Sequence, residues 1–370
     1  MLLRKLKIVH LTAASIWRGA EQQIVQLYQH LEDQCEQVIY CTKNSELGNY
    51  GLKHHFKILE YHRESGLNIS LAKQILKFEK IFQPDLFHVH DPHALNAFII
   101  AQLLGLKTKA VVHRRVDFPL HNGFFSKYKW NHNSILKIIS VSDAVSKVLQ
   151  PYIKDTSKLT TIYDGVEIKD YQVEKREVLQ EEFPICKGKI LVGNIAALVD
   201  HKDYPTFLKT AAIVIHELKR NDIHFFIIGK GAEENLLKAL CAELKLDAHI
   251  TFTGFRNNIP FLIKNLDYLL FTSKMEGLGS TLLQCMAGKL PIIGTTAGGV
   301  QEILFNEYNA LTAEPGDAYT LSQQLLRFIQ ETDLKTQIVN NAFEFVQKYS
   351  AANNALQTYQ TYLSVIQLQP

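Results

Sequence analysis

The sequence predicts an α/β protein with two doubly wound domains, each built on a parallel sheet. The chain has 370 residues, and a single hydrophobic core rarely serves so many. Short β-branched runs alternate with longer segments of helical period, which is the pattern of parallel strands covered by helices. A polar, acidic stretch at 165–187 interrupts this alternation, which then resumes. We therefore expect two domains, at 1–168 and 169–349.

The predicted strands of the first half are short apolar runs. After the first of them, apolar residues between Ile24 and Leu31 recur at helix spacing. The strands are predicted at Lys7–Leu11, Gln37–Cys41, Lys57–Tyr61, Asp85–His90, Lys109–His113 and Lys137–Val141.

The same pattern restarts with six further strands, each separated from the next by a helix-like stretch. Near the end of the chain, Leu356, Tyr359 and Leu363 recur at helix spacing, which predicts a long terminal helix within 350–370. The further strands are predicted at Leu159–Tyr163, Lys189–Gly193, His224–Ile228, His249–Thr253, Asp267–Phe271 and Leu290–Ile293.

Composition excludes several classes of protein. Apolar residues make up 46% of the chain and charged residues 21%, as in ordinary globular proteins. No window has the uninterrupted apolar run of a membrane span. The five cysteines are scattered and odd in number, which fits reduced thiols better than disulfides or a zinc site. We expect a cytoplasmic protein without a secretion signal.

Charge is unevenly distributed along the chain. Residues 1–168 hold 21 Lys and Arg against 15 Asp and Glu, and the rest hold 19 against 22. The first half also holds 11 of the 15 histidines. A basic half suggests an anionic partner or surface, and a mildly basic, solvated face is the plain alternative.

A glycine-rich segment, Glu276-Gly277-Leu278-Gly279-Ser280, follows a predicted strand and precedes a helix. Doubly wound sheets bind ligands beyond the carboxyl ends of their strands, where amides at a helix start can approach a phosphate. Glu276, and Gln284 on the following helix, suit hydroxyl groups. A glycine-rich turn without a ligand is the alternative.

Lys202 lies at the mouth of the same predicted sheet, after the strand that ends near Asn194. Its ammonium group can neutralise a departing diphosphate, although a lysine before a helix is more often simply solvated. The segment Ile228–Glu233 has two glycines after a strand, but Glu234 stands where a dinucleotide fingerprint needs its third glycine. A nicotinamide cofactor is therefore not expected.

In the first half, the loop Trp17–Glu21 joins the first strand to the first helix, and His113 ends a strand beside Arg114 and Arg115. These groups can meet a phosphate or an acidic acceptor. A hydrogen-bonded, structural His113 is equally compatible with the pattern.

A second group of histidines raises the hypothesis of a metal site. It consists of His88, His90, Asp91 and His93. No distant ligands can be named for it, so no metal is expected.

Taken together, these motifs resemble the GT-B glycosyltransferases of family 4, which retain the configuration of the transferred sugar. The resemblance covers nearly the whole chain, and the order of the motifs is its specific part. Glu276 to Gln284 matches the family's Glu-x7-Glu element, with Gln284 in place of the second Glu. The other matching segments are Ser140–Asp143, Asp164–Val166, Phe255–Asn257 and Ala297–Ile303.

The resemblance implies two Rossmann-like domains facing across a cleft, with the terminal helix crossing back to the first domain. It implies that the second domain binds a nucleotide-diphosphate sugar and that the first binds a glycan or lipid-linked acceptor. By this resemblance His113, Lys202 and Glu276 are catalytic. Donor-binding roles are implied for Gly19, Asn194, Arg256, Gly277, Leu278, Gly279 and Gln284, and acceptor-side roles for Arg18, Glu21, Arg114 and Arg115.

The implied reaction is a front-face displacement without a metal or other cofactor, in which the departing diphosphate helps to deprotonate the acceptor hydroxyl. No nucleic acid is expected as a partner. The basic first half suggests peripheral contact with the anionic inner face of a membrane. Neither Asn194 nor Ala197 supplies the diphosphate-binding arginine usual in the family. A catalytically silent nucleotide-sugar-binding protein and a GT-B epimerase or phosphorylase are the competing hypotheses.

Overall fold

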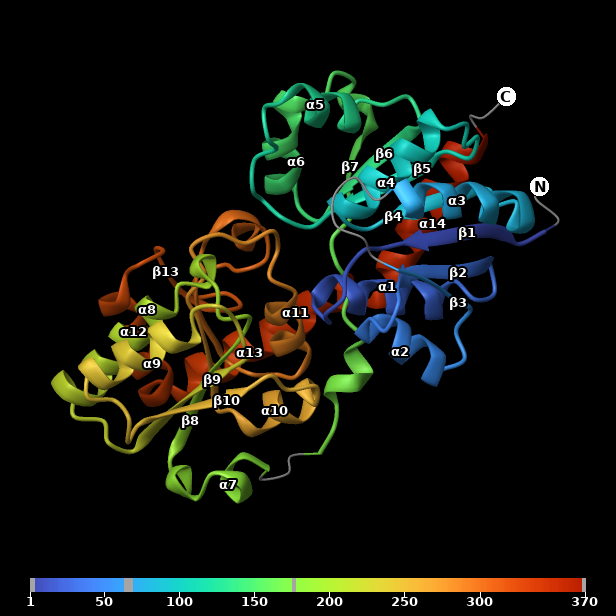
Figure 1. Ribbon diagram of the computed structural model, residues 1–370. Coiled ribbons are helices and arrows are strands. Elements are labelled where there is room, and N and C mark those ends of the chain that lie inside the picture. Colours follow the sequence, from blue (N-terminus) through green and yellow to red (C-terminus); the bar gives the residue numbers. More distant parts are fainter. Residues whose placement is uncertain (1–3, 63–68, 175–177, 368–370) are drawn as a thin grey trace. The chain divides into compact units, whose positions relative to one another are not determined.

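The computed structural model describes residues 4–62, 69–174 and 178–367. It divides the chain into two compact units (Figure 1). One unit consists of Met1–Gly165 together with Ala351–Pro370, and the other is Val166–Ser350. Each unit has its own all-parallel sheet with helices around it, which confirms the predicted doubly wound α/β class.

The first unit is built on a sheet of seven strands. They lie in the order β3-β2-β1-β4-β5-β6-β7, so the winding reverses between the first and fourth strands. Their bounds are β1 Leu6–Leu11, β2 Cys35–Thr42, β3 Ile58–Tyr61, β4 Leu86–Val89, β5 Ala110–Arg114, β6 Ile135–Ser140 and β7 Leu159–Thr161.

The last of these strands belongs to the first sheet. The strand expected at Leu159–Tyr163 opened the second run of predicted strands, although the predicted bounds 1–168 include it in the first domain; β7 pairs with β6 and forms the edge of the first sheet. The alternation of strand and helix carries no mark of which sheet a strand joins, because pairing is decided by contacts distant in the sequence.

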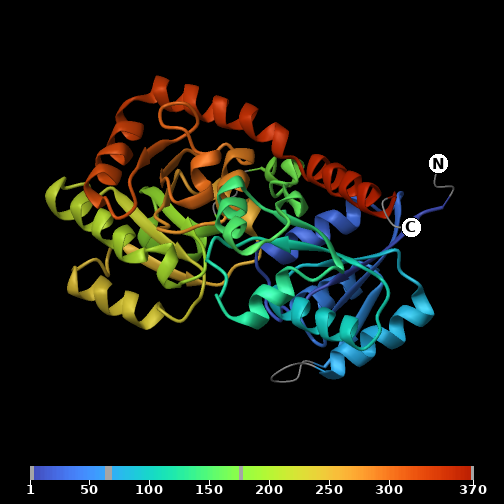
Figure 2. The same ribbon diagram turned by 90° about the horizontal axis from the view of Figure 1, so that it is seen from above.

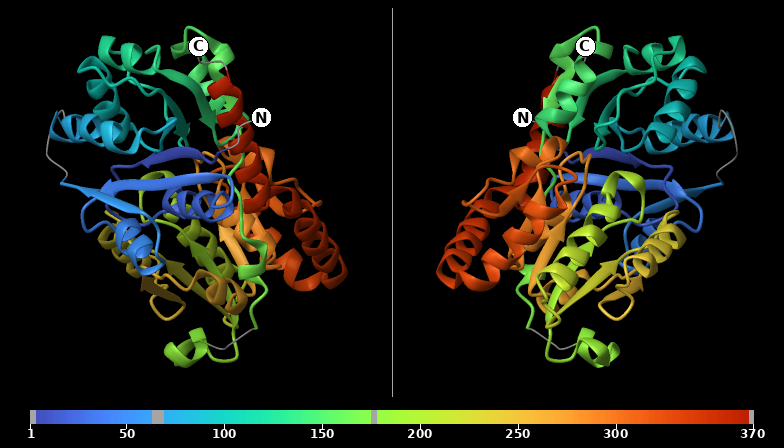
Figure 3. Two further views of the ribbon diagram at one scale, coloured as in Figure 1. Left: turned by 90° about the vertical axis from the view of Figure 1, so that its right-hand side faces the viewer. Right: turned by 90° about the vertical axis from the view of Figure 1, so that its left-hand side faces the viewer.

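Seven helices surround the first sheet in the described part of the chain. On one face, Leu27 of the first helix, Leu31 directly after it, and Ala355 and Val365 of the last helix pack against apolar strand residues. Figures 2 and 3 show this last helix, in red, beside the first helix and the sheet. The helices are α1 Gly19–His30, α2 Glu46–Lys53, α3 Ile69–Phe82, α4 Pro92–Leu103, α5 Phe124–Trp130, α6 Asp143–Leu149 and α14 Ala351–Gln367.

The second unit has a sheet of six strands in the order β10-β9-β8-β11-β12-β13. Its winding reverses between β8 and β11, directly beneath the predicted ligand segments. The three-residue strand β13 was missed in the sequence because it is too short to show a period. The strands are β8 Ile190–Ile195, β9 Ile223–Ile228, β10 Ile250–Gly254, β11 Tyr268–Phe271, β12 Ile292–Thr295 and β13 Leu311–Ala313.

One large apolar core of this unit joins strand residues to residues of the helices α8, α9, α12 and α13. Phe207, Phe225, Leu270, Leu325 and Phe328 are fully buried in it. The helices of the unit are α7 Val178–Glu182, α8 Tyr204–Ala212, α9 Glu234–Glu243, α10 Ile259–Asn265, α11 Ser280–Ala287, α12 Ala318–Gln330 and α13 Thr332–Val346.

Side-chain caps set several helix starts. Asp91 precedes α4, and its Oδ1 accepts from the amides of His93 and Ala94 at 2.9 Å. Asp317 caps α12 in the same manner through the amide of Thr320 at 2.9 Å. Such caps satisfy amides that have no partner within the helix.

The cysteines and the absence of a membrane-spanning helix in the described residues can be compared with what the composition predicted. All five cysteines are free and buried. None of the helices in the described ranges has the length and apolar character needed to cross a membrane.

Candidate functional site

The predicted ligand segments of the second unit lie where its sheet reverses its winding. Loops from the carboxyl ends of β8 and β11 leave the sheet side by side at this point, since these strands are paired. Crevices at such reversal points are the usual ligand sites of doubly wound sheets. The sheet order therefore places the loops that follow Asn194 and Phe271 next to one another.

The loop after β11 brings Glu276 and the glycine-rich segment Gly277–Gly279 to the start of α11. Leu278 is buried and anchors the loop. Gly279 has a positive φ of 88° just before the helix, a backbone conformation that residues with a side chain rarely adopt. The amide of Gly299, in the short helical segment Gly298–Glu302, donates to the carbonyl oxygen of Glu276 at 2.9 Å. The loop is thus held by its own sequence and by the loop after β12.

Lys202 meets Glu276 at this edge of the sheet. Its ammonium group forms an ion pair with Oε2 of Glu276, and the two side chains are 15% and 16% exposed. The Thr272 hydroxyl, at the end of β11, donates to the carbonyl oxygen of Lys202 at 3.1 Å. Asp203 follows in the left-handed region with a φ of 47° and caps α8. A largely buried cation and carboxylate are therefore positioned together, the cation suited to phosphate and the carboxylate to hydroxyl groups.

The other predicted donor-binding residues of this unit have different surroundings. Asn194 is buried at the end of β8, where its Nδ2 lies 3.5 Å from the Thr272 hydroxyl and its Oδ1 has no partner among the described residues. Gln284 lies on α11, in the second turn after Gly279. Arg256 instead pairs with Glu182 of α7 at 2.9 Å. The structure thus brings Lys202 and Glu276 together, and it gives Arg256 a partner outside the predicted set.

The two glycines after β9 have a packing role that the sequence did not reveal. A Cβ on Gly229 would lie 2.0 Å from the carbonyl oxygen of Ala196, and one on Gly231 would lie 2.1 Å from that of Leu198. Gly229 also has a φ of 149°. These glycines let the loop after β8, which leads to Lys202, approach the loop after β9.

In the first unit, Arg114 and Arg115 turn to different partners. The Arg114 guanidinium donates to the carbonyl oxygens of Val116, at 3.0 Å, and Phe118 in its own loop. Arg115 pairs with Asp164 at 3.2 Å, and its Nη2 lies 3.1 Å from Nδ1 of His113. Of these two arginines, Arg115 is the one whose side chain contacts the ring of His113.

The residues of the first loop cap α1. The amide of Arg18 donates to Oε2 of Glu21 at 2.8 Å, and Gly19 is the first residue of the helix. Glu21 is buried, and burial raises the pKa of its carboxyl group. The Glu21 carboxyl therefore acts on the helix start, and Gly19 and Arg18 remain exposed beside it.

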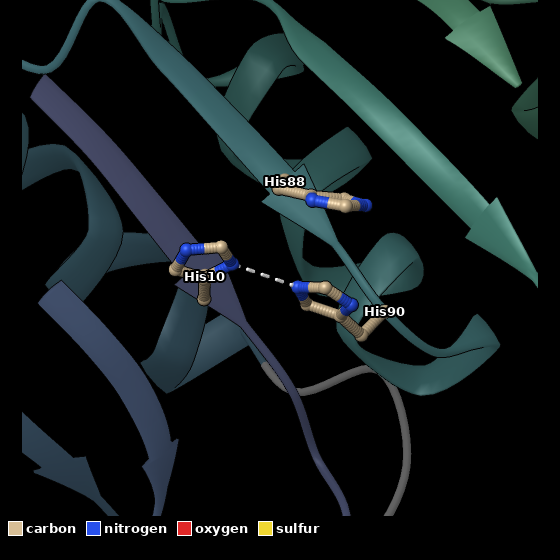
Figure 4. A group of neighbouring side chains, drawn as sticks. All are labelled: His10, His88 and His90. Atoms are coloured by element: carbon tan, nitrogen blue, oxygen red, sulfur yellow. Dashed lines mark hydrogen bonds between the residues drawn. The ribbon is translucent and has the colours of Figure 1, made fainter. Parts of the chain in front are cut away.

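The residues considered as a metal site in the sequence do not form one group in the fold. Asp91 caps α4 and His93 is exposed, so neither joins the histidines. His88 and His90 instead lie with His10 of β1, and one ring nitrogen of each lies within 4.8 Å of the others (Figure 4). These three are the described residues that could hold a metal ion jointly. Both His10 nitrogens are already hydrogen-bonded, to Gln37 and to His90 at 3.0 Å each, so a metal would displace existing bonds.

All four buried histidines of this region favour the neutral form. Burial lowers the pKa of His10 to about 4, and the charge of Arg115 adds to this effect. Burial also lowers the pKa of His88, His90 and His113 well below the usual range. His10 was not singled out in the sequence, since its place beside His88 depends on the pairing of β1 with β4.

Comparison with known proteins gives the class. The fold matches that of Anabaena Alr3699/HepE, solved with UDP and glucose, with a TM-score of 0.85, 19% identity and 97% of this chain and 100% of that chain covered. It also matches a glycosyltransferase from Rickettsia africae ESF-5, with a TM-score of 0.84, 21% identity and 99% and 100% covered. The fold is thus that of the GT-B class.

The sequence matches place the chain within this class. Residues 17–170 match the model described as Glycosyltransferase Family 4, and residues 175–345 match Glycosyl transferases group 1. N-acetyl-alpha-D-glucosaminyl L-malate synthase of Bacillus anthracis is 23% identical, over 80% of this chain and 78% of that protein. UDP-Gal:alpha-D-GlcNAc-diphosphoundecaprenol alpha-1,3-galactosyltransferase of Escherichia coli is 22% identical, over 93% and 95%. The chain belongs to the GT-B glycosyltransferases of family 4.

Proposed function

We propose that the protein is a retaining, metal-independent hexosyltransferase. It moves a sugar from a nucleotide-diphosphate donor to a glycan or lipid-linked acceptor in the synthesis of a cell-surface polysaccharide or glycolipid. The observation that carries this proposal is the ion pair of Lys202 and Glu276 beside the loop Gly277–Gly279, at the reversal point of the second sheet. Two of the similar proteins support the substrate class: Alr3699/HepE was solved in complex with UDP-glucose, and the Escherichia coli galactosyltransferase is named for a diphosphoundecaprenol acceptor.

Each residue of the site has a distinct task in this reaction. The bond between the anomeric carbon and the diphosphate oxygen breaks while the acceptor oxygen bonds to the same face of that carbon. The acceptor proton passes to the departing phosphate. Lys202 and the amides of Gly277 to Gly279 stabilise the charge that develops on the diphosphate. Glu276 accepts hydrogen bonds from hydroxyl groups of the donor sugar, and cations and dipoles of the protein take the place of a metal ion.

A panel of nucleotide-diphosphate sugars in a thermal-shift assay tests the donor site. A donor that binds the native state raises the unfolding temperature by mass action, and a hundredfold excess over Kd stabilises by about 2.7 kcal/mol. We expect one base and sugar to stand out, and Glu276→Gln to reduce that shift. Absence of any shift across the panel, with a folded protein, would reject the donor site.

The stereochemistry and metal independence need the transfer product. With the donor identified, we expect the glycoside formed to keep the anomeric configuration of the donor by NMR, at a rate unchanged by EDTA. An inverted product, or activity lost with EDTA and restored by a divalent cation, would contradict the proposal. Donor binding without transfer to any glycan or lipid-linked acceptor would favour a silent nucleotide-sugar-binding protein.

The membrane contact belongs to the same proposal, and helix α5 supports it. Phe124 and Phe125 are 78% and 83% exposed there, close to the exposed Lys127. Aromatic and basic side chains together suit an anionic lipid surface. We expect flotation with anionic vesicles at low salt that falls with added salt and with Phe124→Ser/Phe125→Ser. Ile81→Ser, at an equally exposed position on α3, is the control, and flotation that the double variant leaves unchanged would exclude α5 as the contact.

A further inference from the structure

Four histidines form one layer at the carboxyl ends of β1, β4 and β5. His10 lies opposite His88 in the pairing of β1 with β4, and His88 lies opposite Val111 of β5. Alternate residues of a strand share a face, so His90 and His113 lie on this same face. Two positions before His10, His88 and His113 on the same face are Ile8, Leu86 and Val111. These three belong to the apolar core under α14. The apolar rows thus end in a layer of buried imidazoles.

The hydrogen-bond directions in this layer are fixed at one end by Arg115. A guanidinium group only donates, so Nδ1 of His113, 3.1 Å from Nη2 of Arg115, must be the accepting nitrogen. The arginine is itself held by Asp164, and the side chains of this pair are 10% and 7% exposed. In a neutral ring, an accepting Nδ1 means that Nε2 carries the proton.

The directions are fixed independently at the other end by Gln37. Its Nε2 donates to the carbonyl oxygen of Tyr28 at 2.8 Å, so its Oε1 is the acceptor for Nε2 of His10 at 3.0 Å. The Nδ1 of His10 is then unprotonated and accepts from Nε2 of His90 at 3.0 Å. This leaves Nδ1 of His90 unprotonated, and it faces Nη1 of Arg115 at 3.5 Å. The chain of bonds from Gln37 thus makes Nδ1 of His90 an acceptor, which is the role that a facing guanidinium group requires.

We propose that Arg115 is a positioning residue that holds His113 in the tautomer with the proton on Nε2. In this tautomer His113 presents a donor and not an acceptor. Its Nε2 is buried and has no hydrogen-bond partner in the described part of the chain. A buried donor without a partner is costly, and an oxygen of a bound ligand satisfies it. For the proposed glycosyltransferase function, on which this last step rests, that oxygen is a hydroxyl group of a bound substrate.

The network also explains why the ring stays neutral. Burial, the charge of Arg115 and the neighbouring His88 all lower the pKa of His113. A protonated ring would place a hydrogen on Nδ1 directly against the guanidinium group. Burial is the largest of these causes, so burial keeps the ring neutral, while Arg115 adds to the effect and sets the tautomer. Lysine keeps the positive charge of Arg115 without its planar fork of donors, whereas an uncharged side chain removes both.

The tautomer is measured directly, without any substrate, by long-range ¹H–¹⁵N correlation spectra of the full chain labelled with ¹⁵N-histidine. His113→Gln assigns the His113 signals, and His224, which bonds Thr251 in the other unit, is the internal control. We expect a protonated Nε2 and an unprotonated Nδ1 at His113 in the native protein. In Arg115→Met we expect a mixture of the two tautomers, with the proton on Nδ1 in part of the molecules. In Arg115→Lys we expect the native tautomer to predominate again. His224 should not change in either variant.

With the donor and acceptor identified, Arg115→Met should lower kcat/KM by about tenfold, as for one lost hydrogen bond, and Arg115→Lys should recover most of it. A protonated Nδ1 at His113 in the native protein would overturn the proposal even if neither variant folds. An unchanged tautomer in a folded Arg115→Met protein would overturn it too. The native tautomer in a protein that transfers no sugar would leave the assignment of Arg115 standing and would reject the proposed function.

Discussion

At the scale of residues, the site depends on side chains whose neighbours in the sequence turn elsewhere. Arg114 and Arg115 are adjacent, yet one is bonded to carbonyl oxygens of its own loop and the other to Asp164 and His113. Their orientations differ because successive side chains of an extended chain point to opposite faces. Sequence reasoning treated the two as equivalent, and only the strand geometry separates them.

Lys202 is the first test at this scale. Lys202→Ala removes the cation that stabilises the departing diphosphate, and we expect transfer to fall on the order of a hundredfold. The fold should persist because the side chain is not in the core. Lys274→Ala is the matched control, since that lysine pairs with Asp200 at 2.7 Å on the surface of the same region. Unchanged turnover in a folded Lys202→Ala protein would remove this residue from the mechanism.

His10 gives a prediction on pH and stability. Burial, the largest cause, lowers the pKa of this histidine to about 4 in the folded state, against about 6.5 in the unfolded chain. Above pH 6.5 both states are neutral. As the pH falls the unfolded state binds the proton first, so the free energy of unfolding decreases between pH 6.5 and pH 4. For His10 alone the loss from pH 7.5 to pH 5 is about 2 kcal/mol.

Urea unfolding of the native protein and of His10→Gln at these two pH values measures this loss. Glutamine cannot take up the proton, so the variant should lose less stability on acidification even though it is less stable at pH 7.5. Equal losses in both proteins would show that His10 does not remain neutral in the fold.

At the scale of elements, loops are held in place by contacts between neighbouring strand ends. The loop after β8 leads to Lys202, and it approaches the loop after β9 closely at Gly229 and Gly231. The amide of Leu198 donates to the carbonyl oxygen of Lys230 at 3.0 Å across this approach. The glycines that suggested half of a dinucleotide fingerprint are thereby accounted for by loop packing.

Gly229→Ala tests this packing. The added Cβ would meet the carbonyl oxygen of Ala196 at 2.0 Å, and the residue has a φ of 149°. We expect a loss of about 3 kcal/mol or more in the free energy of unfolding, from clash and backbone strain combined. Gly188→Ala is the control, with a φ of 75° but open space around it; it should lose only about 1 kcal/mol. Similar losses at both sites would contradict a packing role.

At the scale of the whole molecule, the chain builds one unit from two distant segments and the other from a single segment. Residues Ala351–Pro370 belong to the first unit, although they follow the whole of the second. In α14, Tyr362 is fully buried and its hydroxyl lies 2.6 Å from Nδ1 of His88. The terminal helix therefore completes the first core, and the second unit is formed by the single segment Val166–Ser350.

Fragments of the chain test this arrangement. A fragment of residues 166–350 should fold alone and unfold cooperatively in urea, because its core lies within one segment. A fragment of residues 1–165 lacks α14 and leaves its apolar layer uncovered, so we expect it to be poorly folded until a peptide of residues 351–370 is added. Far-UV circular dichroism follows both. Cooperative unfolding of residues 1–165 alone would contradict the role given to α14.

Local patterns in the amino-acid sequence were enough to predict the two parallel sheets, most of their strands and the segments that carry Lys202 and Glu276. These features follow from short-range periodicity and from glycine-rich turns placed after strands, which are local properties. Only the three-dimensional packing shows that β7 forms the edge of the first sheet, that Arg256 pairs with Glu182, and that His10 joins His88 and His90. Each of these depends on pairing between residues far apart in the chain, and such pairing is settled by the packing of whole elements because no local pattern encodes it.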